Sequence, residues 1–227
     1  MAEQNVFTKK HADVVEKDKK AILEELSLPP AVIEFIRKNE RIIKLALIVF
    51  VITVVAIQGY KKYTSVRTAK SSTLLYSALQ TENGTQEVKL LKQLRDKYAG
   101  TGSGLWANIE LGHLAFKNGN FAKAAVIFSA VIDKMAAKNT AYPLVQYSLA
   151  QSYENLGNID KAKDAYLKLS QISGFAGMGD LGLARIYEKH GDPAQAVTYY
   201  KGYAELPETQ PGPLKDWVLA KIDQLKK

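Results

Sequence analysis

The sequence predicts an all-α fold in which a helical-repeat solenoid follows one transmembrane helix. Two observations support this prediction. An apolar run covers residues 45–57, and a pattern of leucine, glycine, alanine and aromatic residues recurs three times between residues 111 and 200. Hydrophobic residues make up 47% of the chain and charged residues 24%, close to the average of globular proteins, so we expect the chain to fold.

Length, cysteine content and charge limit the possible functions. With 227 residues the chain has room for one domain of ordinary size, an anchor and a tail. Because it contains no cysteine, disulfides, thiolate metal sites and thiol catalysis are excluded. The net charge of +8 comes mainly from residues 60–227, where 22 Lys and Arg stand against 15 Asp and Glu. These cations are dispersed among acids, which is typical of a solvated helical surface.

The apolar run reads LALIVFVITVVAI, and Thr53 is its one polar member. Extended to Ile42–Tyr60 it has nineteen residues, which as a helix span about 28 Å, close to the hydrocarbon thickness of a bilayer. It is apolar on every face, whereas the alternative, a buried core helix of a soluble protein, usually keeps a polar stripe. Lys44 can extend its ammonium group to the interface, where Tyr60 is a typical anchor. We therefore predict a transmembrane helix at residues 41–60.

Residues 1–40 are interpreted as a tail with short helices. Apolar residues share one face between Asp13 and Leu26, which predicts an amphipathic helix there. The proline pair at 29–30 should end that helix, and Pro30 suits the first turn of another. The tail is either a docking segment for a partner or a simple solvated extension.

The apolar run follows some forty residues of charged sequence and lacks a small-x-small cleavage site. An uncleaved signal anchor is therefore expected. Cations flank the run on both sides, so charge alone does not set its orientation in the membrane.

The repeated pattern is centred on Gly119, Gly157 and Gly191, which are 38 and then 34 residues apart. An alanine follows each glycine by five residues and an aromatic residue by nine. A leucine and a small residue precede each glycine by eight and seven residues. In the three copies these are Leu111, Gly112, Ala124 and Phe128; Leu149, Ala150, Ala162 and Tyr166; and Leu183, Ala184, Ala196 and Tyr200.

This spacing is typical of a helix–turn–helix unit. The small residue of the first helix lets the second helix approach closely, and the glycine ends the first helix in the left-handed conformation that other residues resist. Asn120, Asn158 and Asp192 follow the glycines and are predicted to cap the second helices, and Pro193 suits a first turn. One pair cannot bury its own apolar face, so the pairs should stack into a solenoid.

The pattern resembles the tetratricopeptide repeat, and Tyr147–Leu169 matches it best. The resemblance implies three tetratricopeptide-like repeats at residues 105–210. The tryptophan typical of that repeat is missing from its usual place in all copies, although Trp106 lies near it in the first. Ala115 replaces the tyrosine that the other two copies have before the glycine.

Two flanking segments complete the predicted stack. Residues 61–104 should form a degenerate helix pair, Val66–Gln80 and Gln86–Tyr98, that caps the N-terminal end and continues from the membrane helix. Residues 211–227 should form a C-terminal capping helix that starts at Pro213 and packs one side on the stack. That side carries Leu214, Val218, Ile222 and Leu225. Its lysines should face water; they are Lys215, Lys221, Lys226 and Lys227.

The order of these parts, with the stretch LLKQLRDKYAGTGSGLWANIELGHLAFKNGNFAKAA, resembles the YfgM-type family of ancillary subunits of the bacterial Sec translocon. The resemblance covers residues 30–227 and rests on architecture and repeat placement. It implies a single-pass protein of the bacterial inner membrane with a cytoplasmic N-terminus and periplasmic repeats. It also implies protein partners, namely Sec translocon subunits, periplasmic chaperones or exported proteins.

Partner-binding residues are predicted on the first helices of the repeats, which line the concave face of such solenoids. Aromatic side chains beside polar ones suit recognition of an extended peptide or a helix. The candidates are Trp106, His113, Phe116 and Lys117 in the first copy, Tyr147, Gln151, Glu154 and Asn155 in the second, and Arg185, Glu188 and Lys189 in the third. Ile109, Leu144 and Leu181 belong either to this face or to the core.

Catalysis is not expected. The three histidines, His11, His113 and His190, are scattered over the tail, a helix and a turn, and no catalytic motif of hydrolases, zinc proteases or nucleotide-binding loops is present. The glycines of Gly100–Gly104 are interpreted as a linker because the lysine and the preceding strand of a phosphate-binding loop are missing. No cofactor, metal, nucleic acid or small-molecule substrate is therefore predicted.

Three functions remain open at this point. The first is a protein-interaction scaffold that links the Sec translocon to periplasmic chaperones or exported clients. The second is a scaffold for another envelope complex, in outer-membrane assembly or cell-wall synthesis. The third is a basic module that binds anionic lipid or nucleic acid, for which a steep loss of binding with salt would be diagnostic.

Overall fold

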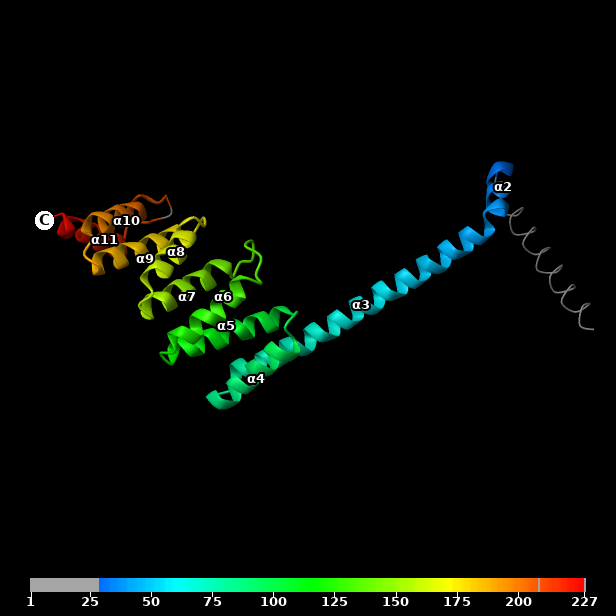
Figure 1. The fold of residues 1–227 in the computed structure, drawn as a ribbon, viewed down its shortest axis with the longest axis horizontal. Coiled ribbons are helices and arrows are strands. Elements are labelled where there is room, and N and C mark those ends of the chain that lie inside the picture. The colour runs from blue at the N-terminus through cyan, green and yellow to red at the C-terminus, as the bar shows by residue number, and fades with distance from the viewer. Residues whose placement is uncertain (1–28, 208, 227) are drawn as a thin grey trace, which may run out of the picture. The chain divides into compact units, whose positions relative to one another are not determined.

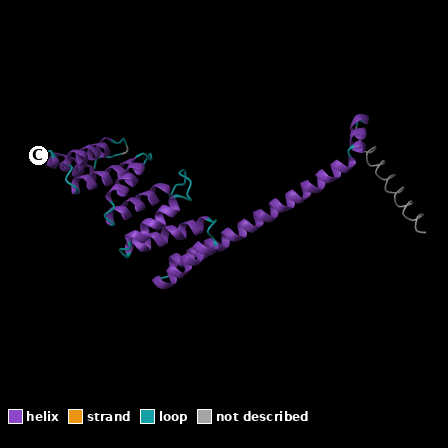
Figure 2. Ribbon diagram, in the orientation of Figure 1, coloured by secondary structure: helices purple, strands orange, loops and turns teal. Residues whose placement is uncertain are grey.

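The computed structural model describes residues 29–207 and 209–226. This part of the chain is built from helices and contains no strand (Figure 2), which confirms the predicted all-α class. The chain divides into two compact units, residues 1–64 and 65–227. The helix predicted between Asp13 and Leu26 lies outside the described residues.

Helix α2 spans Pro30–Lys38, and Pro30 occupies its first turn as predicted. Helix α3 follows after Asn39 and runs over 41 residues, Glu40–Gln80. Its most apolar stretch has a mean hydropathy of 2.5 and no buried residue, so α3 is long and apolar enough to cross a membrane by length and composition. The helix continues beyond Tyr60 and ends at Gln80, where the predicted helix Val66–Gln80 also ends. The single Gly59 costs only about 1 kcal/mol in a helix interior, too little to break a helix of this length.

The last turns of α3 and helix α4, Gly84–Lys97, form the first helix pair of the second unit. Asn83 caps α4, because its side chain accepts hydrogen bonds from the backbone of Thr85 and Gln86. This cap explains why α4 begins before the predicted start. Ala78, Leu91 and Leu94 form the core of this pair and continue into the next helix.

Three further helix pairs and one last helix follow, and each packs against its predecessor (Figure 1). Their bounds are α5 Gly102–Lys117, α6 Phe121–Ile132, α7 Tyr142–Asn155, α8 Ile159–Ser170, α9 Ala176–Lys189, α10 Pro193–Glu205 and α11 Pro213–Leu225. The predicted repeat order is therefore observed, with α5, α7 and α9 as first helices and α6, α8 and α10 as second helices.

The turns inside the three pairs have the chemistry that the sequence predicts. Gly119, Gly157 and Gly191 have φ values of 73°, 80° and 78°, a region that favours glycine. The side chains of Asn120, Asn158 and Asp192 each accept a hydrogen bond from the backbone three residues later.

The repeats bury one aromatic residue each. Phe128, Tyr166 and Tyr200 are at most 1% exposed. A Cβ atom added at Gly182 of α9 would lie 2.4 Å from the ring of Tyr166, so this ring reaches the first helix of the next repeat. The ring of Tyr166 therefore fills the groove between the second and third repeats.

Helix α11 packs on α10 through Val218 and Ile222, which share a cluster with Tyr200, and Leu225 packs against the same cluster. The prediction is wrong for Leu214, which is 51% exposed. The prediction that its lysines face water is wrong for Lys221. The side chain of Lys221 is only 25% exposed, and its Nζ donates a hydrogen bond of 2.6 Å to Glu188 of α9. Lys221 thus lies on the side of α11 that faces the stack, where the Glu188 carboxylate accepts its hydrogen bond.

Candidate partner-binding face

The predicted binding residues lie along the first helices of the repeats. On α5, Trp106, His113 and Lys117 follow one another at helical spacing and are exposed. The Nε2 atom of His113 lies 3.3 Å from Oγ of Ser148 on α7. The rows of exposed side chains on these two helices, here called stripes, are therefore next to each other. Arg185 of α9 contacts α7 in turn.

The three stripes therefore form one surface, which we call the first-helix face. Its exposed members are Trp106, His113, Lys117, Leu144, Asn155, Arg185 and Lys189. Leu144 is 50% exposed and belongs to this face, whereas Ile109 is 2% exposed and belongs to the core. Leu181 is half-buried and packs against the last core cluster.

A polar network joins the second repeat to the third. The Glu154 carboxylate on α7 accepts a hydrogen bond of 2.8 Å from the Tyr166 hydroxyl on α8. It also accepts two from Arg185 on α9, at 2.9 Å from Nε and 2.7 Å from Nη2. Nη2 of Arg185 donates a further bond of 3.0 Å to the Tyr166 hydroxyl. A bidentate pair of this kind fixes orientation as well as charge, so it sets the angle between successive first helices.

The same arrangement recurs one repeat later. The Glu188 carboxylate on α9 accepts a hydrogen bond of 2.8 Å from the Tyr200 hydroxyl on α10 and one of 2.6 Å from Lys221 on α11. In both copies the glutamate precedes the tyrosine by twelve residues. Lys221 thus takes the place of Arg185, and α11 occupies the position of a first helix in a fourth, incomplete repeat.

These contacts change the acidity of the groups involved. Burial alone would raise the pKa of Glu154, but hydrogen bonds from Arg185 and Tyr166 outweigh it and hold the pKa below its ordinary value. The same balance, with Lys221 and Tyr200 as donors, lowers the pKa of Glu188. Burial and the adjacent carboxylate raise the pKa of Tyr166 above its ordinary range. Both carboxylates are therefore ionised at neutral pH and serve as acceptors.

The first repeat lacks this network. Phe116 and Phe128 stand where the other copies have glutamate and tyrosine. Phe116 packs edge-on against Phe121 with ring centroids 5.1 Å apart, and His113 lies 5.2 Å from Phe128. Gln151 stands where Arg185 does and donates to the Tyr147 hydroxyl at 3.0 Å, within its own helix. These ring contacts lie within the first repeat, between α5 and α6, and the polar contact from α5 to α7 is the one between His113 and Ser148.

The structure thus separates the predicted residues into two groups. Glu154, Arg185 and Glu188 are held by partners within the chain, and Phe116, Tyr147 and Gln151 are half-buried. Trp106, His113, Lys117, Asn155 and Lys189 are exposed and make up the accessible part of the set.

The sequence analysis did not identify three members of this network, Tyr166, Tyr200 and Lys221. The recurrence of glutamate twelve residues before tyrosine would have been the signal for the two tyrosines.

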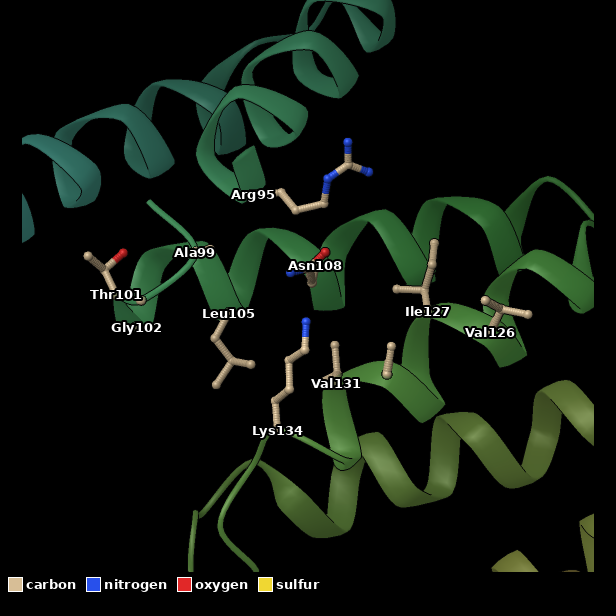
Figure 3. A pocket seen from close by; sticks show the side chains of 12 residues that line it. Arg95, Ala99, Thr101, Gly102, Leu105, Asn108, Val126, Ile127, Val131 and Lys134 are labelled. Atoms are coloured by element: carbon tan, nitrogen blue, oxygen red, sulfur yellow. The ribbon is translucent and has the colours of Figure 1, made fainter. Parts of the chain in front are cut away.

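A separate hollow of about 550 Å³ lies among α4, α5, α6 and the loop after α6 (Figure 3). Leu105, Asn108 and Val131 line it, with Arg95 and Lys134 as its cations. Its lining residues include no acid or histidine. The predicted linker Gly100–Gly104 borders it and starts α5, where Thr101 caps the helix. Within the described ranges no group of three His, Cys, Asp or Glu residues is arranged to hold a metal ion.

Stacked helix pairs with an exposed first-helix face define a helical-repeat scaffold, a class of fold whose members bind other proteins. The family described as a tetratricopeptide repeat-like domain matches residues 34–227, and the chain belongs to this family.

A solved structure shows the same fold. The chain is similar to a single-residue variant of nearly identical tetratricopeptide-like repeats assigned to a kinesin light chain of Podosopora anserina. The TM-score is 0.53 with 18% identity over 70% of this chain and 84% of that one. Another structure of those repeats gives a TM-score of 0.48 with 17% identity over 70% of this chain and 95% of that one. No curated protein matches the sequence.

Proposed function

We propose that this protein is a membrane-anchored scaffold that binds other proteins through its first-helix face. The observation that carries the proposal is the continuity of that face over three repeats, in a chain whose α3 is long and apolar enough to cross a bilayer. No catalytic role is proposed.

The accessible side chains suit a particular kind of partner segment. Trp106 is 45% exposed and Leu144 50% exposed, and each lies on a stripe that also carries polar groups. Lys117 and Lys189 add positive charge near the ends of α5 and α9. An extended peptide or helix with apolar side chains and a few acidic ones would match this surface.

The anchor places this face beside a membrane. In the proposal α3 spans the bilayer over residues 41–60, the tail of residues 1–40 is cytoplasmic and the repeats of residues 105–210 are periplasmic. Support for this topology comes from the resemblance to the YfgM-type family. That resemblance also favours an ancillary role at the Sec translocon, with periplasmic chaperones or exported proteins as further partners.

Site-specific photocrosslinking in intact membranes would test the proposal. A photoreactive amino acid replaces Lys117 on the first-helix face, and a matched variant carries it at Lys123, which is exposed on the second helix α6. We expect protein adducts at Lys117 that are absent at Lys123, and mass spectrometry would identify them. Equal labelling at both positions would refute the first-helix face as the binding surface.

The identity of the adducts and a protease control separate the finer alternatives. Translocon subunits, together with repeats that an external protease degrades, would support the Sec role. Adducts with outer-membrane assembly or cell-wall synthesis proteins alone would keep the scaffold and discard that role. Repeats protected from the protease would reverse the topology. Binding to anionic lipid or nucleic acid that falls steeply with salt would favour the basic-module alternative.

A further inference from the structure

The short helix α2 has two chemically distinct sides. Ala31, Val32, Phe35 and Ile36 fall on one side of the helix, and Glu34, Arg37 and Lys38 fall on the other. None of its nine residues is buried, and the Phe35 side chain is 63% exposed. The structure therefore leaves an apolar helix face without a cover from the described part of the chain.

Such a face needs a partner. Isolated helices shorter than about 12–15 residues are marginal in water, and α2 has only nine residues. Packing of its amphipathic face against an apolar medium would supply what helix propensity does not.

The connection to α3 fixes where α2 lies. Only Asn39 separates the two helices, and α3 begins at Glu40. With the membrane span starting at Arg41, Asn39 lies about 3 Å outside the hydrocarbon, at 1.5 Å per residue. The headgroup layer on each side of a bilayer is about 5–7 Å thick. Asn39 and the end of α2 are then inside that layer.

The chain turns at this point. Asn39 has φ −111° and ψ 19°, and its side chain donates a hydrogen bond of 2.9 Å to the carbonyl oxygen of Phe35. Helix α2 consequently leaves the axis of α3 (Figure 1). A helix that bends away from a transmembrane axis within the headgroup layer can lie along the membrane surface.

We propose that α2 is an interfacial helix, which lies in the membrane surface with Val32, Phe35 and Ile36 at the boundary between headgroups and acyl chains. The basic side chains of Arg37 and Lys38 face the headgroups, as in other amphipathic helices that bind anionic membranes. This inference rests on the proposed function, because it requires α3 to span the bilayer. It adds a second membrane contact, which fixes the rotation and depth of the anchor.

The chain contains no cysteine, so single-cysteine variants of the full chain can be labelled at one position. An environment-sensitive fluorophore is attached at Phe35→Cys on the apolar side, at Glu34→Cys on the polar side, and at Val54→Cys in the middle of the apolar stretch. Each variant is reconstituted in vesicles of phosphatidylethanolamine and phosphatidylglycerol. Quenching is measured with lipid-attached nitroxides and with aqueous iodide.

We expect nitroxide lipids to quench the label at residue 35 several-fold more than the label at residue 34, and iodide to show the reverse order. Equal access of iodide to both positions, with residue 54 quenched by nitroxide lipids, would overturn the interfacial helix and keep the membrane anchor. A label at residue 35 shielded from both quenchers would also overturn it, because a protein segment would then cover the face. Iodide access at residue 54 would refute the anchor itself.

Discussion

Replacing Glu154 by alanine removes the group that ties the second repeat to the third. The carboxylate accepts a hydrogen bond of 2.8 Å from Tyr166 and bonds of 2.7 Å and 2.9 Å from Arg185. In the alanine variant the hydroxyl of Tyr166, a residue that is fully buried, has no acceptor, and the guanidinium of Arg185 has no carboxylate. We therefore expect the stack to be destabilised at this junction.

The size of the effect follows from the exposure of the two partners. A buried hydroxyl that loses its hydrogen-bond partner costs about 1–3 kcal/mol. The Arg185 side chain is 47% exposed, so the ion pair itself contributes no more than about 0.2–1 kcal/mol. Together these give a loss of about 1–4 kcal/mol in the free energy of unfolding. For a unit of this size, each kcal/mol corresponds to a decrease in Tm of roughly 2–4 °C.

Urea unfolding in detergent micelles would measure this loss. The tryptophans of the chain, Trp106 and Trp217, both lie in the compact unit of residues 65–227. Their fluorescence therefore reports on the unfolding of that unit and not on the membrane helix. The matched control is Glu82→Ala, which removes an exposed carboxylate and should change stability by less than about 0.5 kcal/mol. A double-mutant cycle with Tyr166→Phe should give a coupling energy of about 1 kcal/mol. A Glu154→Ala effect no larger than the control, or a coupling energy of zero, would refute the reasoning.

Four further outcomes are expected. The pKa of Glu154 lies below its ordinary 4.5 in the folded state. The ionised carboxylate therefore stabilises the fold fully above pH 4.5, and this stabilisation is lost as the pH falls through the folded-state pKa. In a plot of the urea midpoint against pH, Glu154→Gln should flatten the acid side. Gly179→Ala should cost about 1–3 kcal/mol in urea unfolding, because its Cβ would lie 2.5 Å from a backbone nitrogen of α8, whereas Gly100→Ala, with no atom within 4 Å, should be nearly neutral. Asp192→Ala should cost about 1 kcal/mol in the same assay, because the side chain caps α10 with a bond of 3.0 Å. Val51→Lys should weaken resistance to carbonate extraction, because a lysine at the centre of a membrane helix costs about 2.5–3.5 kcal/mol, and Gly100→Lys should leave it unchanged.

The parts of the fold that the sequence predicts well are those set by neighbouring residues. The turn at Gly191 and Asp192 needs a left-handed residue followed by a side-chain cap, and both requirements are visible within two positions. The stacking of the pairs follows from the spacing of small and aromatic residues. The end of α3 at Gln80 is also the predicted end of the helix Val66–Gln80, although the apolar run itself ends at Ile57.

The network between repeats could not be predicted in the same way, because its members are distant in the chain. Glu188 and Lys221 are 33 residues apart, and helix α11 lacks the glycine of the repeat pattern. Leu219 and Ala220 do precede Lys221, as Leu183 and Ala184 precede Arg185, and this shared order is the sequence signal that places α11 as a first helix. The hydrogen bond from Lys221 to Glu188 could not be predicted from that signal, because it depends on how α11 packs on α10.

The network also bears on how the first-helix face recognises a partner. A partner that took up Glu154 or Arg185 would have to replace hydrogen bonds that hold adjacent repeats together, so the cost of opening the junction would subtract from its affinity. Groups without such bonds carry no such cost. Trp106 and Lys117 on α5, Leu144 on α7 and Lys189 on α9 satisfy this condition. The proposed binding energy should therefore come mainly from these exposed side chains, while the junction between Glu154 and Arg185 sets the geometry of the surface.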